Sequence, residues 1–118
     1  MKLIVAGSRS IKDCTTLESE LSKIKPDMII CGGAKGVDRC AILYATQHNI
    51  PFKVFYPNYQ MYGKIAPLIR NSKMATYGSQ LLAIWDGKSR GTIHMVNEIR
   101  KLDKPFKLID LSVGVNDG

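Results

Sequence analysis

Short apolar runs alternate along the chain with longer segments in which apolar residues recur at helical spacing. Runs of this length, rich in β-branched residues and bounded by glycine or proline, are typical of strands covered on both faces. The sequence therefore predicts five strands, at residues 2–6, 27–31, 52–56, 80–85 and 106–111.

The segments between these runs predict helices, because their apolar residues fall three or four positions apart. Thr15 and Glu18 have the spacing of a capping box, which places the first helix start near them. Residues 58–66 show little period and are expected to form a loop with one helical turn. The predicted helices cover residues 13–25, 37–44, 67–78 and 91–102.

Strands and helices that alternate in this way form βαβ units with right-handed crossovers and a mainly parallel sheet. The predicted fold is therefore a small α/β fold of the Rossmann-like, doubly wound, three-layer kind. A chain of 118 residues with 45% hydrophobic content can bury one core. We expect one domain over residues 1–111, with a flexible tail at 112–118.

The chain holds no apolar run long enough to cross a membrane, and the run at its beginning is too short for a signal peptide. A cytoplasmic protein without membrane contact is therefore expected. Cys14, Cys31 and Cys40 are odd in number and lack metal-type spacing, so we interpret them as reduced thiols that pack in the core. Neither a metal ion nor a cofactor is predicted.

Lysine and arginine outnumber aspartate and glutamate by 17 to 10, which gives a formal charge of +7 and favours an anionic partner. In doubly wound sheets, ligands bind at the carboxyl ends of the strands, and three loops there combine glycine with cations. Glycines and helix starts present N–H groups to phosphate. The predicted ligand-binding residues are Gly7, Ser8, Arg9, Gly32, Gly33, Lys35, Gly36, Asp38, Arg70, Asn71, Asp86, Gly87, Lys88, Ser89, Arg90, Gly91 and Thr92.

Each motif also has a structural interpretation. The glycines of residues 32–36 suit a tight turn, Asp86 and Gly87 suit another, and Thr92 suits a helix cap. Arg70 taken alone suits a solvated helix position, and Asp38 suits an acid that complements a helix dipole. Three such loops at one sheet edge are hard to explain as turns alone, and this convergence favours a phosphate site.

The motifs at residues 5–9, 31–38, 69–75 and 85–92 together resemble the YspA-like branch of the SLOG superfamily over nearly the whole chain. That superfamily is Rossmann-like and includes lysine decarboxylase-like phosphoribohydrolases, the DNA-processing protein DprA and predicted nucleotide sensors. The resemblance implies a nucleotide or nucleotide-derived ligand, and a homodimer as a candidate assembly. Arg70 falls on the phosphoribohydrolase arginine, and Asn71 stands where a lysine would be.

Met95 stands where the phosphoribohydrolases carry a glutamate, so the resemblance leaves catalysis open. Arg70, Asp86 and Glu98 are the candidate catalytic residues, with Asp38 as a further carboxylate. The leading hypothesis is a nucleotide-binding sensor or sequestering protein whose tyrosine-rich loop faces the base. A nucleotide N-glycosidic hydrolase is the first alternative, and a DprA-like DNA-binding accessory protein is the second.

Overall fold

The structure is a computed structural model that describes residues 1–112, so the predicted tail lies outside the described residues from position 113 onward. Five strands form one sheet in the order β3-β2-β1-β4-β5, and every neighbouring pair is parallel. This confirms the predicted Rossmann-like α/β fold. The strands are β1 (Lys2–Gly7), β2 (Met28–Cys31), β3 (Phe52–Val54), β4 (Gln80–Trp85) and β5 (Phe106–Asp110).

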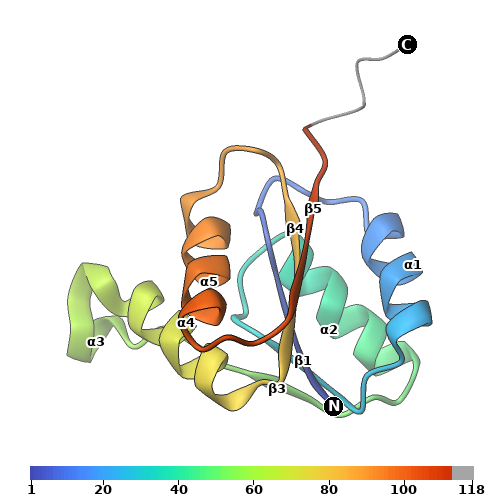
Figure 1. The fold of residues 1–118 in the computed structure, drawn as a ribbon, viewed down its shortest axis with the longest axis horizontal. Coiled ribbons are helices and arrows are strands. Elements are labelled where there is room, and N and C mark those ends of the chain that lie inside the picture. Colours follow the sequence, from blue (N-terminus) through green and yellow to red (C-terminus); the bar gives the residue numbers. More distant parts are fainter. Residues whose placement is uncertain (113–118) are drawn as a thin grey trace.

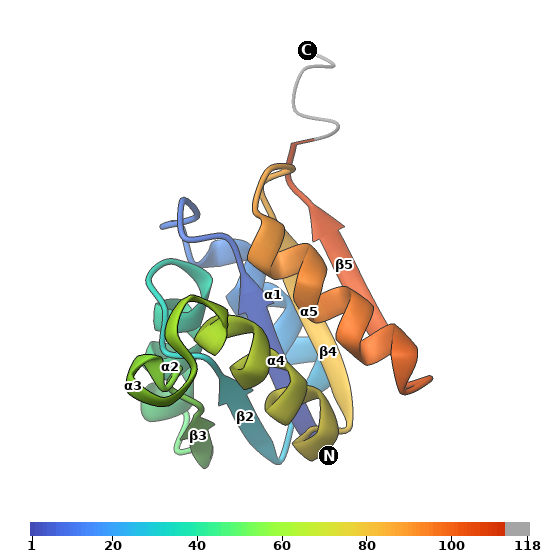
Figure 2. The ribbon, with the colours of Figure 1, turned by 90° about the vertical axis from the view of Figure 1, so that its left-hand side faces the viewer.

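Helices cover both faces of the sheet (Figure 1). One face carries α1 and α2, and the other carries α4 and α5, while α3 and a short 3₁₀ segment project beside α4 (Figures 1 and 2). None of the described helices is long and apolar enough to cross a bilayer. Their bounds are α1 (Thr15–Ile24), α2 (Val37–Gln47), α3 (Tyr59–Tyr62), η1 (Gly63–Ile65), α4 (Ala66–Tyr77) and α5 (Arg90–Lys101).

The two faces of β1 belong to two separate cores. Leu3 and Val5 pack with α1 and α2, whereas Ile4 and Ala6 pack with α4 and α5. Successive strand side chains point to opposite faces, and here both faces are buried. This explains why the strands read as continuous apolar runs rather than as alternating ones.

The predicted capping box at Thr15 and Glu18 does not form. The helix begins at Thr15 itself, and the Asp13 carboxylate accepts hydrogen bonds from the Thr15 N–H at 2.9 Å and the Thr15 hydroxyl at 2.6 Å. Similarly, α5 begins one residue earlier than predicted, with Ser89 rather than Thr92 as its cap. Both differences come from short polar side chains that reach the first free N–H groups of a helix.

Two of the three cysteines form a disulfide between Cys14, just before α1, and Cys40 in α2. The prediction of reduced thiols is therefore wrong for this pair, while Cys31 is free and buried. Their Cα atoms lie 5.4 Å apart, within the range that a disulfide bridges, because α1 and α2 pack on the same face. A separation of 26 residues along the chain gave no sign of this proximity.

Candidate ligand site

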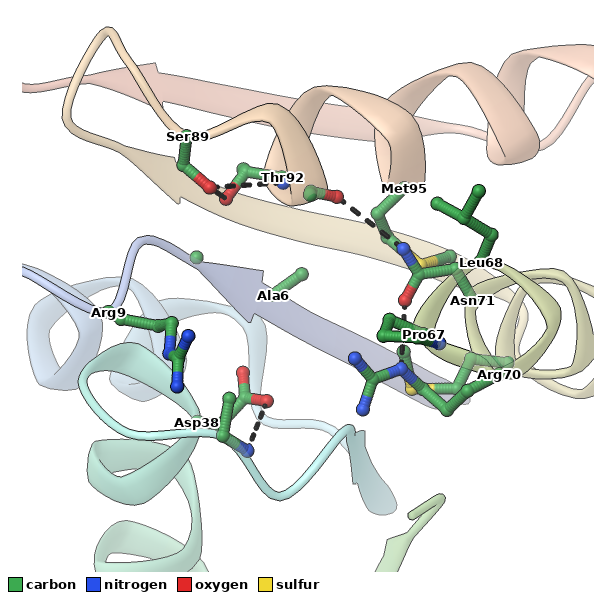
Figure 3. Close-up of a pocket in the computed structure, with 14 residues that line it drawn as sticks. Ala6, Arg9, Asp38, Pro67, Leu68, Arg70, Asn71, Ser89, Thr92 and Met95 are labelled. Atoms are coloured by element: carbon green, nitrogen blue, oxygen red, sulfur yellow. Dashed lines mark hydrogen bonds between the residues drawn. The ribbon is translucent and has the colours of Figure 1, made fainter. Parts of the chain in front are cut away.

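A cavity of about 120 Å³ lies at the carboxyl edge of the sheet, where the strand order reverses between β1 and β4 (Figure 3). Ligands of doubly wound sheets bind at this kind of position. We call it the central cavity. Eight predicted binding residues line it: Gly7, Arg9, Asp38, Arg70, Asn71, Ser89, Gly91 and Thr92.

Gly36 presses the loop before α2 against the loop after β1. Its φ of +76° lies in the region that favours glycine. A Cβ atom at this position would lie 2.5 Å from the Ser8 carbonyl oxygen and 2.8 Å from Arg9 Cα. The close approach of these two backbones brings Arg9 to the edge of the cavity.

Asp38, at the start of α2, places a carboxylate in the central cavity although its side chain is buried. Its Oδ2 accepts hydrogen bonds from the N–H groups of Gly32 and Ala34, both at 3.1 Å. Burial raises the pKa of Asp38 to about 6, against the lowering effects of these hydrogen bonds and of Arg70. In the view of Figure 3 the carboxylate lies between the Arg9 and Arg70 side chains. Asp38 can therefore change its protonation state close to neutral pH.

Arg70 is a half-buried residue that joins α4 to the ends of two strands, so the interpretation as a solvated helix residue is wrong. Its Nη1 donates to the carbonyl oxygens of Gly32 at 2.6 Å and Phe55 at 3.3 Å, and its Nε donates to Asn71 Oδ1 at 3.0 Å. A Cβ atom at Gly32 would collide with Arg70 Nη1, so a larger residue here would displace the guanidinium. The guanidinium is thus held in place before any ligand arrives.

Asn71 connects α4 to α5 across the cavity. Its Nδ2 lies 3.0 Å from His94 Nδ1 and 3.5 Å from the Gly91 carbonyl oxygen, and its side chain is buried. The amide therefore satisfies groups on both helices. This contact fixes the distance between Arg70 and the first turn of α5.

Asp86 does not line the central cavity; it organises its own loop. Its Oδ1 accepts from the N–H groups of Lys88 and Ser89, and its Oδ2 accepts from the Ser10 hydroxyl at 2.7 Å. These hydrogen bonds, that from Ser10 first, lower the pKa of Asp86. The Ser8 hydroxyl accepts from the Asp86 N–H at 2.9 Å and ties this loop to the one after β1.

Glu98 also lies outside the lining of the cavity. It accepts hydrogen bonds from Lys101 Nζ at 2.7 Å and from the Ser72 hydroxyl, and both lower its pKa. Of the three candidate catalytic residues, the structure therefore brings only Arg70 to the cavity. Within residues 1–112, Asp38 is the carboxylate that lines it, and Met95 forms part of the apolar wall.

A second hollow, of about 440 Å³, lies beside the first, and Arg9 lines both. We call it the basic cavity; its lining is Arg9, Lys12, Lys35, Gly36, Arg39, Leu43 and the Cys14–Cys40 disulfide. Sequence reasoning missed Lys12 and Arg39. Arg39 lies in the first turn of α2, directly after the loop that carries Lys35, and this position in the sequence is the signal that could have found it.

The other predicted residues lie around these two hollows. Lys88 and Arg90 line a shallower hollow of about 370 Å³ on the outer side of α5, with Trp85 and His94. Ser8, Gly32, Gly33 and Gly87 line neither cavity; the three glycines shape the backbone of their loops, and Ser8 acts through the hydroxyl that accepts from the Asp86 N–H. In the described part of the chain, no three His, Cys, Asp or Glu side chains gather as a metal site would require.

The sequence profile of the YspA, cpYpsA-related SLOG family matches residues 1–62, which is more than half of the chain. The protein belongs to this family. No curated protein matches the sequence. The family assignment confirms the resemblance that the glycine motifs indicated.

Two solved structures of DNA processing protein A share the fold of this SLOG-family chain. The protein from Streptococcus pneumoniae has a TM-score of 0.81 at 16% sequence identity, over 97% of this chain and 52% of the other. The protein from Helicobacter pylori, described for its single-stranded DNA binding mode, has a TM-score of 0.73 at 20% sequence identity. That match covers 97% of this chain and 67% of the other. The chain thus spans about half of the first relative and two thirds of the second.

Proposed function

We propose that the protein binds a nucleotide or nucleotide-derived ligand, with one phosphate group in the central cavity, and serves as a sensor or sequestering protein. The observation that carries this proposal is the convergence of Arg9, Arg70 and the first turn of α5 on one cavity. Guanidinium groups form strong charge-assisted hydrogen bonds to phosphate, and the first N–H groups of a helix lack intrahelical acceptors.

The size of the cavity limits what it encloses. At about 120 Å³ it is smaller than the roughly 300 Å³ at which pockets for whole small molecules begin. A phosphate or a sugar fits inside, and the base must lie outside. Tyr56 and Tyr59 are well exposed, at 73% and 60%; Tyr56 lies next to Gly33, and Tyr59 is near enough to Arg70 to act on its charge. Their rings offer a stacking surface for the base.

The test compares nucleoside monophosphates with the matching nucleosides by calorimetry. Arg9 is exposed and forms no ion pair or side-chain hydrogen bond with the described residues, so Arg9→Ala removes a phosphate contact without removing a structural one. We expect binding of the monophosphate to weaken about tenfold or more. Arg100→Ala, an equal charge change at the far end of α5, is the control.

Two results would contradict the proposal. One is a wild-type protein that binds none of the monophosphates, and the other is an Arg9→Ala variant that behaves like Arg100→Ala. Mass spectrometry of small molecules released from the purified protein provides an independent route to the ligand. A released nucleotide would identify the base that the sequence leaves open.

N-glycosidic hydrolysis of nucleotides is the second candidate, and the position of Asp38 favours it. A carboxylate with a pKa of about 6 in a cavity can activate water for attack on the ribose carbon while the base leaves. Release of free base, followed by chromatography, should then be lost in Asp38→Asn and kept in Glu98→Gln, whose carboxylate lies outside the cavity. Absence of base release in the wild type would leave binding as the function.

Binding of single-stranded DNA is the third candidate, and it is supported by the fold shared with DNA processing protein A. An unstructured oligonucleotide should then bind with an affinity that falls steeply as salt increases, because bound phosphates release counterions. A small nucleotide held by one phosphate depends less on salt. The slope of affinity against salt concentration therefore separates the two kinds of ligand.

A further inference from the structure

The basic cavity gathers four positive charges and no negative one. Arg9, Lys12, Lys35 and Arg39 line it, and its lining contains no aspartate or glutamate. None of the four forms an ion pair with a carboxylate in residues 1–112, whereas Lys23, Lys101 and Lys107 each do. Charges of one sign held together raise the local concentration of anions.

The fold positions the backbone of these four residues on two chain segments, residues 9–12 after β1 and residues 35–39 at the start of α2. Lys12 lies two residues before Cys14, and Arg39 lies next to Cys40, so the disulfide fixes both segments at the cavity wall. Gly36 holds the backbone of Arg9 against the loop that carries Lys35. The backbone positions of the four cations are therefore set in the free protein, and their exposed side chains become ordered when a ligand binds.

We propose that the basic cavity binds a chain of two or more phosphate groups that runs outward from Arg9. At about 440 Å³ the hollow exceeds what one phosphate needs, and its four cations match several anionic groups in a row. Because Arg9 lines both cavities, a nucleoside polyphosphate can place its inner phosphate at the central cavity and its outer ones at Lys12, Lys35 and Arg39. That form of the proposal rests on the proposed function, while free inorganic polyphosphate offers the same chemistry.

The experiment measures binding of four probes by calorimetry: inorganic orthophosphate, inorganic tripolyphosphate, adenosine monophosphate and adenosine triphosphate. The test variant is Lys12→Ala/Arg39→Ala, both exposed positions, and Lys64→Ala/Arg100→Ala is a control of equal charge. We expect both triphosphate probes to bind the test variant at least about tenfold more weakly than the control. Adenosine monophosphate should bind the two variants equally, because the central cavity is unchanged.

Comparison of the probes on the wild-type protein identifies the source. Tighter binding of adenosine triphosphate than of tripolyphosphate indicates a nucleotide that uses both cavities, and equal binding indicates a free phosphate chain. Failure of tripolyphosphate to bind, or equal loss in the test variant and the control, overturns the proposal. Binding of tripolyphosphate with failure of every nucleoside monophosphate overturns the proposed function of the central cavity and leaves the basic cavity supported.

Discussion

The loop between β2 and α2 and the loop between β4 and α5 have similar compositions but different origins of stability. In the first, side chains at two glycines would meet other parts of the chain: a Cβ atom at Gly36 would collide with the Arg9 backbone, and one at Gly32 would displace the Arg70 guanidinium. The second is organised around the carboxylate of Asp86, which accepts hydrogen bonds from two N–H groups of its own turn and from the Ser10 hydroxyl. A glycine-rich motif can therefore mark either a close approach between two backbones or local turn chemistry.

The acids of the two loops differ in the same way. Burial raises the pKa of Asp38, whereas hydrogen bonds from Ser10 and nearby N–H groups lower the pKa of Asp86. The buried acid costs stability when it is charged, and the exposed acid contributes stability when it is charged. The two loops should therefore respond in opposite directions to pH.

The largest expected effect is that of Gly36→Ala. Alanine at this position would hold a strained positive φ, which costs about 1–3 kcal/mol, and its Cβ atom would collide with the Ser8 and Arg9 backbones. We therefore expect the free energy of unfolding to fall by about 4 kcal/mol in total. Gly63→Ala is the matched control, since Gly63 has a similar positive φ of 57° but open space around it. Urea unfolding of the two variants separates strain from collision, and equal losses would show that Gly36 makes no tertiary contact of consequence.

Removal of the disulfide should have the next largest effect. Cross-linking residues 26 positions apart reduces the entropy of the unfolded chain by an amount worth about 3–4 kcal/mol. We expect Cys14→Ser/Cys40→Ser, and wild-type protein treated with a phosphine reductant, to lose similar stability in urea unfolding. A midpoint that neither treatment moves would show that the two helices stay in place without the covalent link.

The pH dependence of stability is the third prediction. The pKa of Asp38 is raised to about 6 in the folded protein. The stabilising effect of its protonated form is therefore complete below about pH 4 and is lost as pH rises through about 6. The free energy of unfolding should fall by about 3 kcal/mol over this range. Asp38→Asn, whose amide oxygen can still accept from the Gly32 and Ala34 N–H groups, should remove this loss and be more stable than wild type at neutral pH.

Asp86→Asn is the companion of that experiment and should change stability in the other direction. The pKa of Asp86 is lowered, so its contribution is present above its unfolded pKa of about 4 and is lost as pH falls through the lower folded value. The variant should therefore be less stable than wild type at neutral pH and converge with it in acid. Parallel pH profiles for both variants would contradict the contrast between the two loops.

The smallest expected effect is that of Gly91→Ala in the first turn of α5. A Cβ atom there meets nothing within 4 Å, and alanine is the better helix former, so we expect a gain of about 0.5 kcal/mol. Thermal unfolding measures the gain. A clear loss of stability would show that a side chain at Gly91 is not tolerated, as we expect for the glycines of the β2–α2 loop.

The sequence predicts all five strands and four of the helices because buried parallel strands and amphipathic helices leave distinct periods in apolar residues. Strand β3 is shorter than predicted, ending at Val54 rather than at residue 56. The disulfide could not be predicted, because the packing of α1 against α2 brings Cys14 and Cys40 together and no local pattern records it.

The sequence was enough to predict which loops form the site, but not which side chains point into it. Carboxyl ends of parallel strands meet at one edge, so Arg9, Arg70 and Thr92 could be expected together there. Which carboxylate enters the cavity depends on hydrogen bonds within each loop. Asp38 is drawn inward by the Gly32 and Ala34 N–H groups, and Asp86 is drawn outward by Ser10 and its own turn.

The hydrogen bonds of Ser8 and Ser10 to residue 86 have a consequence for motion. They brace the loops after β1 and β4 against each other, so that wall of the central cavity moves as one unit. The opposite wall, at Pro67 and Leu68 of α4, follows α3 and the 3₁₀ segment in the chain, and α3 projects from the body of the molecule (Figure 1). Opening and closing of the cavity should therefore occur by displacement of the α3–α4 corner, with rapid amide hydrogen exchange there and slow exchange at the braced loops.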